Sequence, residues 1–146
     1  MSEKVTILVV DDVLQTMHAV SRLLEEVGYR VIGAASGGDC LRLTQEHRPA
    51  LTLLKTTLPD IDGLEVCRRI KADPNLAGSF VVLLSNLKTT TEEQAQGLEE
   101  GADGYIAGPI SNRELLARVE ALLRIRQTEA QVQHLNAVLR AIRNVN

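Results

Sequence analysis

The feature that most limits how this chain can fold is the alternation of five short apolar runs with five helical patterns. The runs, built mainly from Val, Ile, Leu and Ala, lie at 5–10, 28–34, 51–54, 80–84 and 104–107. The helical patterns follow at 13–27, 36–47, 63–72, 90–100 and from 111 onward. Short connections between such units require right-handed crossovers and a parallel sheet. We therefore expect an α/β fold, a doubly wound three-layer sandwich around a five-stranded parallel sheet.

Composition fits one soluble domain and excludes several classes of function. The 146 residues can bury a core, and with 2% aromatic residues that core must be aliphatic. A net charge of −3 gives no general attraction to nucleic acid or to an anionic membrane. No apolar run could span a membrane and no signal-peptide pattern is present, so we expect a cytoplasmic location. Cys40 and Cys67 fall at apolar helical positions and are expected to be reduced core residues.

Four of the apolar runs end in residues that could form a site together. Asp11 and Asp12 follow the first run, Lys55 the third, Ser85 the fourth and Gly108 the fifth. The carboxyl ends of parallel strands meet at the edge of an open α/β sheet where ligands bind. Two adjacent carboxylates repel each other and favour a cation. Helix capping is the alternative, and it accounts for one aspartate better than for two.

Four motifs at these positions resemble one family in their order and spacing. They are VVDD at 9–12, LPDIDG at 58–63, LLSN at 83–86 and GADGYIAGPIS at 101–111. On these motifs the chain, over about residues 5–126, resembles the receiver domain of two-component response regulators, which is CheY-like. The resemblance implies a flavodoxin-like sheet in the order 2-1-3-4-5.

The resemblance also implies a phosphoryl switch. In that family an acidic pair and an aspartate ending the third strand hold Mg²⁺, and this aspartate accepts a phosphoryl group from a histidine kinase. The acidic pair corresponds to Asp11 and Asp12. Ser85 corresponds to the phosphate-binding hydroxyl and Tyr105 to the switch aromatic. Thr57 corresponds to a metal-site residue, and Pro109 to a candidate cis proline.

Two positions depart from the family pattern. Lys55 stands where the phosphoacceptor aspartate is expected, and Gly108 where the phosphate-binding lysine is expected. An ammonium cannot form an acyl phosphate, and its charge replaces that of a metal, so no Mg²⁺ cofactor is expected. We predict instead an ion pair from Lys55 to Asp11, Asp12 or both. The alternative is that Lys55 extends to solvent and the site has decayed.

The loop after the third strand offers a second functional reading. An active receiver could catalyse its own Mg²⁺-dependent phosphorylation at a displaced carboxylate, Asp60 or Asp62. Both lie too far along the loop to share a metal with the acidic pair unless the loop folds back, and turn formation accounts for both.

The last helix is expected to continue beyond the domain, because no Gly or Pro interrupts 111–146. A heptad spacing of mostly apolar residues follows at 125, 128, 132, 135, 139 and 142. We therefore expect a receiver domain at 1–126 and a helical linker at 127–146 that begins a coiled coil or signalling helix. The alternative is a helix that folds back on its own domain. His134 lacks the acidic residue and proline that follow a kinase phosphoacceptor histidine.

The sequence thus favours a pseudo-receiver that is not an enzyme but a protein-interaction and dimerisation module of a larger sensor or regulator. Its expected partners are a histidine kinase or an output domain, in the same full-length chain, and a second copy bound through the last helices. No nucleic acid or membrane partner is expected. The acidic helix at 90–100 could support the dimer by pairing with arginines of the neighbour's last helix, Arg113, Arg118 and Arg124.

Overall fold

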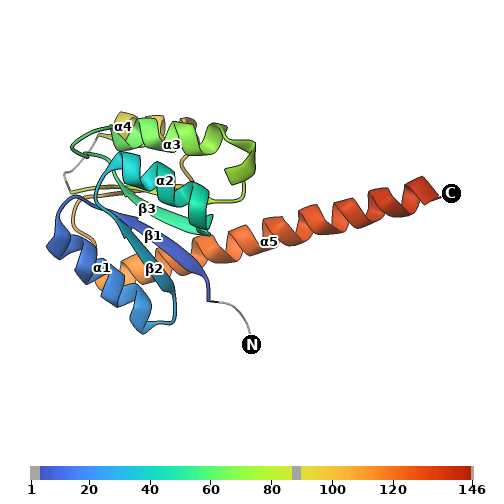
Figure 1. Cartoon of the computed structure of the whole chain (residues 1–146), viewed down its shortest axis with the longest axis horizontal. Helices are drawn as coiled ribbons and strands as arrows, with labels where there is room; N and C mark the ends of the chain where they lie inside the picture. The colour runs from blue at the N-terminus through green and yellow to red at the C-terminus, as the bar shows by residue number, and fades with distance from the viewer. Residues whose placement is uncertain (1–3, 87–89, 146) are drawn as a thin grey trace.

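The chain folds as a three-layer α/β sandwich with a long C-terminal helix, in a computed structural model that describes residues 4–86 and 90–145 (Figure 1). The strands are β1 (Thr6–Val10), β2 (Arg30–Ala34), β3 (Leu51–Lys55), β4 (Phe80–Ser85) and β5 (Gly104–Ala107). The helices are α1 (Leu14–Glu26), α2 (Gly37–His47), α3 (Gly63–Ala72), the 3₁₀ helix η1 (Pro74–Leu76), α4 (Thr91–Glu99) and α5 (Asn112–Val145).

The sheet has the predicted topology. Its strand order is β2-β1-β3-β4-β5, and every pair is parallel. All five carboxyl ends therefore point to one edge, which brings Val10 level with Leu54 and Lys55 level with Leu84. The predicted fold class is confirmed.

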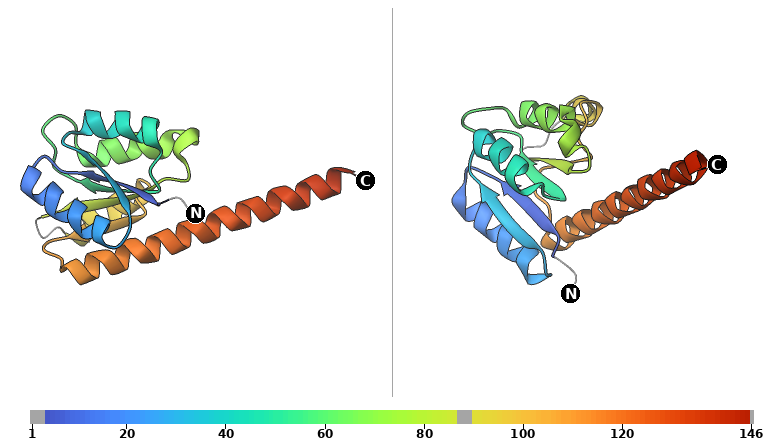
Figure 2. Two further views of the ribbon diagram at one scale, coloured as in Figure 1. Left: turned by 60° about the horizontal axis from the view of Figure 1, so that its bottom comes forward. Right: turned by 45° about the vertical axis from the view of Figure 1, so that its right-hand side comes forward.

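Successive side chains along each strand point to opposite faces of the sheet and pack into two aliphatic cores, one on each face. Leu8, Leu54 and Leu83 pack under α2 and α3, whereas Ile7 and Leu53 pack against α1 and α5. Figures 1 and 2 show these two pairs of helices on opposite faces of the sheet. Burial on both faces explains why the central strands read as continuous apolar runs.

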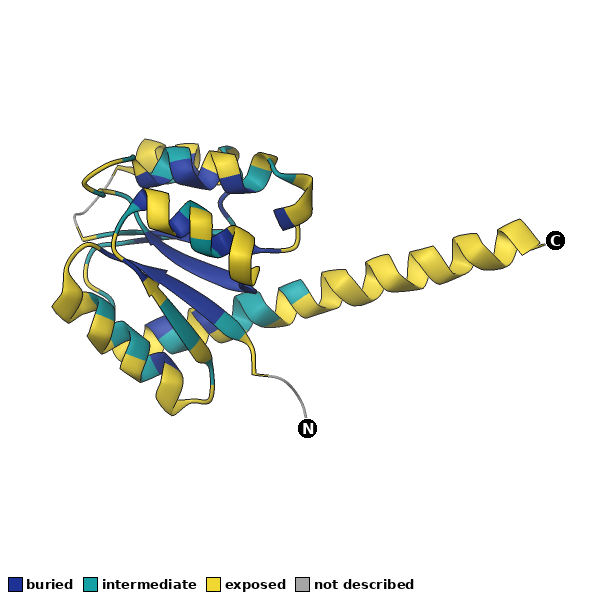
Figure 3. Ribbon diagram, viewed as in Figure 1, coloured by how far each residue is buried: buried dark blue, intermediate teal, exposed yellow. Residues whose placement is uncertain are grey.

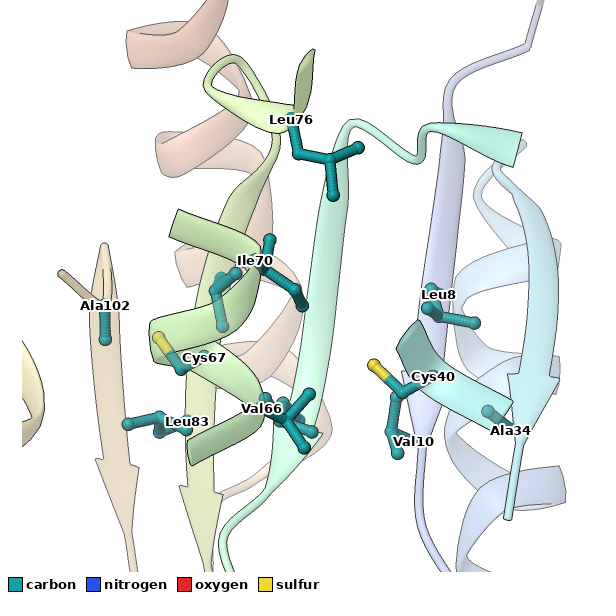
Figure 4. Close-up of a cluster of buried hydrophobic side chains, with 12 residues drawn as sticks. Leu8, Val10, Ala34, Cys40, Val66, Cys67, Ile70, Leu76, Leu83 and Ala102 are labelled. Atoms are coloured by element: carbon teal, nitrogen blue, oxygen red, sulfur yellow. The ribbon is translucent and has the colours of Figure 1, made fainter. Parts of the chain in front are cut away.

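Both cysteines are core residues, as predicted. Cys40 of α2 and Cys67 of α3 are fully buried and not disulfide-bonded, and Figure 4 shows them on separate helices within one cluster. Burial raises the pKa of each thiol to about 11, so neither is a reactive thiolate near neutral pH.

Helix α5 has two different halves. Leu115 and Val119 are buried against the sheet, and Arg126 donates a hydrogen bond from Nε to the Gly78 carbonyl at 2.6 Å. Every residue from 127 to 145 is exposed (Figure 3). The fold-back alternative is therefore wrong, while the division of the chain at residue 126 stays a prediction. No helix in the described part of the chain is both long and apolar enough to cross a membrane.

Candidate functional site

The backbone ladder continues past the strand ends and fixes the loops at the carboxyl edge. The Asp11 N–H donates to the Ala34 carbonyl at 3.0 Å, and the Thr56 N–H donates to the Leu84 carbonyl at 2.9 Å. The Gly108 N–H donates to the Ser85 carbonyl at 2.8 Å. Side chains at these positions are thus held by rigid elements.

Lys55 forms the predicted ion pair, and it does so with both aspartates. Its Nζ lies 2.8 Å from Asp12 Oδ1 and 3.5 Å from Asp11 Oδ1. The side chains of Lys55 and Asp11 are only 16% and 12% exposed, and that of Asp12 is 37% exposed. Lys55 therefore does not extend to solvent, and that alternative is wrong.

The ion pair between Lys55 and Asp12 holds these two residues in their charged forms. The hydrogen bond from Lys55 lowers the pKa of Asp12 below its ordinary value of 3.8. Reciprocally, the hydrogen bond to Asp12 raises the pKa of Lys55 above its ordinary value of 10.5. A lysine held as the ammonium has no lone pair and cannot act as a nucleophile.

Helix capping does not account for the acidic pair. Helix α1 has Val13 at its N-cap with no side-chain cap. Asp11 Oδ1 accepts a hydrogen bond from the Val13 N–H at 2.9 Å, one residue before the helix begins. This bond orients Asp11 in the turn that precedes the helix. Asp12 does not cap the helix, and its charged partner is Lys55.

The residues present do not fit a Mg²⁺ ion. Mg²⁺ requires oxygen ligands, and the side chain that β3 contributes next to the two carboxylates is an ammonium. Thr57 is exposed in the loop that follows. Within the described residues, no three His, Cys, Asp or Glu side chains are grouped as a metal site would need.

Asp60 has a structural role that sequence reasoning missed. Its Oδ1 accepts from the Gly37 N–H and its Oδ2 from the Gly38 N–H, both at 2.9 Å. These hydrogen bonds to the first turn of α2 lower the pKa of Asp60. Asp62 caps α3 and accepts from the Leu64 N–H at 2.8 Å. The two consecutive glycines were the available signal, because they expose N–H groups that need an acceptor.

A cavity of about 230 Å³ lies beside Lys55. Its walls include Ser85, Gly108 and Pro109. The predicted cis peptide at Pro109 was wrong, because no peptide bond among the described residues is cis. Gly108 has a φ of 75°, a left-handed conformation that favours glycine, and it makes the turn there with a trans bond to the proline.

Tyr105 lies on β5 and is half-buried, with its ring against α4. The contact depends on Gly97, because a Cβ at that position would come within 2.9 Å of the ring. Its assignment as a switch residue stays a prediction.

A flavodoxin-like sandwich with an acidic pair at the carboxyl edge defines a class of signalling domain, and comparison with known proteins identifies the family. The family model described as "Response regulator receiver domain" matches residues 7–120. The chain therefore belongs to the response regulator receiver domain family of two-component signalling.

Similar proteins agree with this assignment. The transcriptional regulatory protein AfsQ1 of Streptomyces coelicolor is 41% identical over 120 residues, which are 82% of this chain and 51% of AfsQ1. The alkaline phosphatase synthesis transcriptional regulatory protein PhoP of Bacillus subtilis is 38% identical over 118 residues, which are 81% of this chain and 48% of PhoP. The chain thus spans about half the length of these relatives.

Solved structures show the same architecture. A CheY-like receiver domain protein of Methanospirillum hungatei superposes with a TM-score of 0.81 at 28% identity, covering 87% of this chain and 99% of that one. A BeF3-activated DrrB receiver domain gives a TM-score of 0.73 at 34% identity, with coverage of 84% and 99%.

Proposed function

We propose that this chain is a pseudo-receiver of phosphorelay signal transduction, in which Lys55 replaces the phosphoacceptor aspartate. One observation carries the proposal: the Lys55 ammonium lies 2.8 Å from Asp12 and 3.5 Å from Asp11. It supplies internally the positive charge that a metal supplies in a phosphorylated receiver, so the domain is held in one state. On this proposal the chain is not an enzyme.

The domain then acts through its surfaces, as a protein-interaction and dimerisation module of a larger cytoplasmic sensor or regulator. The matched region makes up only about half of each relative's own length, which supports a neighbouring output domain as a partner. Other receivers pair with histidine kinases, and we propose such a kinase as the second partner. A second copy would bind through α5, whose outer half exposes Leu135, Leu139 and Ile142.

The contacts of Asp60 and Asp62 count against phosphorylation at a displaced carboxylate. Both Asp60 oxygens accept backbone N–H groups of α2, and Asp62 caps α3. Either residue would have to give up these bonds to reach a metal held at Asp11 and Asp12.

Intact mass after incubation with Mg²⁺ and acetyl phosphate tests the proposal. We expect no added phosphoryl group, because no free carboxylate ends β3. A phosphoryl adduct that maps to Asp60 or Asp62 would instead establish an active receiver with a displaced acceptor. A phosphorylatable receiver treated in parallel serves as the positive control for the donor.

Replacing Lys55 tests the proposed origin of the site. In Lys55→Asp a third carboxylate replaces the cation, so Mg²⁺ affinity should rise at least about tenfold over the parent chain. Lys55→Asn is the matched control, because it removes the ammonium without adding a carboxylate. Titration calorimetry with Mg²⁺ measures both variants. Equal Mg²⁺ binding by the two would show that the geometry of this edge does not fit a receiver metal site.

A further inference from the structure

A second, larger cavity lies at the amino edge of the sheet, opposite Lys55. It has a volume of about 740 Å³ and is lined by the amino ends of β1 and β2, the end of α2, the residues before β3, and α5. In Figure 1 this is the side on which β1 begins and from which the outer half of α5 projects. A cavity of this size can hold a small-molecule ligand.

The lining is strongly basic. The basic side chains are Lys4, Arg30, His47, Arg48 and Arg126, and none of the described residues that line the cavity is acidic. This concentration occurs in a chain whose net charge is −3. Three of the five are guanidinium groups, whose fork of N–H donors matches the oxygens of a phosphate group. We call these five residues and the space between them the basic pocket.

The backbone at Arg48 is a second, independent observation. Arg48 follows α2 with a φ of 44°, and it is the one non-glycine residue in the described ranges with a positive φ. Glycine is the usual residue at a helix end of this conformation. The positive charge of Arg48 also interacts favourably with the C-terminal end of the α2 dipole, as any cation at this position would. The backbone therefore does not explain an arginine, and a test has to separate binding by the guanidinium from helix stabilisation.

Arg126 ties the basic pocket to the helix that leaves the domain. Its side chain is half-buried, and its Nε donates to the Gly78 carbonyl at 2.6 Å. Arg126 also lines the basic pocket, and it stands where the exposed half of α5 begins. A ligand held here would contact both the sheet edge and the base of the projecting helix.

We infer that the basic pocket binds a small anion that carries two or more phosphate groups. The pocket is lined by no Phe, Tyr or Trp among the described residues, so the phosphate groups rather than a stacked base provide the binding. The inference does not rest on the proposed function, since the two sites lie at opposite edges of the sheet. It gives a receiver without a phosphoacceptor a separate place at which a phosphorylated ligand can act.

Titration calorimetry of the full chain with inorganic pyrophosphate, at fixed ionic strength, tests the inference. We expect saturable binding to one site and the same affinity for ADP within about threefold, because the base makes no contact. Arg48→Gly should weaken binding at least about tenfold while its melting temperature stays at or above that of the parent, because glycine suits the left-handed backbone. Arg30→Gln should weaken binding similarly and serves if Arg48→Gly does not fold.

Arg140→Gln is the matched control, since it removes the same charge from the exposed half of α5, away from the basic pocket. It should leave the affinity for pyrophosphate unchanged. The inference is overturned if pyrophosphate does not saturate the chain, or if Arg140→Gln weakens binding as much as Arg48→Gly does. It is also overturned if an acidic peptide such as oligoglutamate binds the pocket where pyrophosphate does not, which would identify a protein segment as the occupant.

Discussion

Lys55 is where one side chain changes what the fold can do. The ion pair with Asp11 and Asp12 is partly shielded from water, so its net contribution lies between that of an exposed pair and that of a buried one. The positions of the three residues at strand ends predicted that they would meet. The sequence could not decide between the two aspartates, because that depends on the turn in which Val13 holds Asp11.

Removing the Lys55 ammonium should destabilise the fold, because the acidic pair then has no counter-charge. In Lys55→Met, Asp11 remains mostly shielded without a counter-charge, so the free energy of unfolding should fall by about 1–3 kcal/mol. Urea unfolding followed by circular dichroism measures the change. A double-mutant cycle with Asp12→Asn separates the pair from the packing of the lysine stem. Additive effects in the cycle would mean that the two residues do not interact.

The same pair predicts a pH dependence with a definite sign. The lowered pKa of Asp12 means that its contribution to stability is present above about 3.8 and is lost as pH falls through the folded-state value. The raised pKa of Lys55 means that its contribution is present below about 10.5 and is lost as pH rises through the folded-state value. The stability difference between the parent chain and Lys55→Met should therefore be constant from pH 5 to 9 and shrink towards pH 3. Melting temperatures of both proteins from pH 3 to 9 measure it, and a difference as large at pH 3 as at pH 7 contradicts the assignment.

At the scale of elements, hydrophobic periodicity predicted all five strands and all five α-helices. Each segment shows either the short apolar run of a buried strand or the apolar stripe of a helix that packs on the sheet. The helical patterns predicted from 36 and from 90 begin at Ser36 and Thr90, and in the structure these two residues cap α2 and α4. The helix η1, the trans bond at Pro109 and the contacts of Asp60 were not predicted. Each depends on which distant segment lies next to a loop, and one sequence read locally does not contain that information.

Gly63 shows how an element boundary positions the site. A Cβ at this residue would lie 2.3 Å from the Lys55 carbonyl oxygen, which is backbone and cannot move aside cheaply. Gly63→Ala should therefore lower the free energy of unfolding by about 1–3 kcal/mol and displace the end of β3. Gly78→Ala is the matched control, since nothing lies within 4 Å of its added Cβ. Chemical denaturation of both variants checks the prediction, and equal stability would mean that the approach of α3 to β3 is looser than this structure has it.

At the scale of the whole molecule, the sheet separates two charged regions, and the outer half of α5 projects away from the domain (Figure 1). The carboxyl edge carries the acidic pair with Lys55 as its counter-charge, and the amino edge carries the basic pocket. The exposed half of α5, residues 127–145, extends about 28 Å at 1.5 Å per residue. A helix of this length with an apolar stripe is marginal alone, so its stability in solution should depend on a partner.

The heptad spacing predicts that this partner can be a second copy, packed along the a and d positions. Leu135 lies on that stripe and is exposed in the single chain, and Ala137 lies on the opposite side of the helix. Leu135→Glu should weaken self-association at least about tenfold, because a carboxylate would be buried in the seam. Ala137→Glu adds the same charge outside the seam and should leave association nearly unchanged. Sedimentation equilibrium at several protein concentrations measures both variants beside the parent.

If the parent chain is monomeric at every concentration, the stripe binds a different helix rather than its own copy. If Ala137→Glu dissociates the dimer as strongly as Leu135→Glu, general charge repulsion rather than the heptad seam governs the contact.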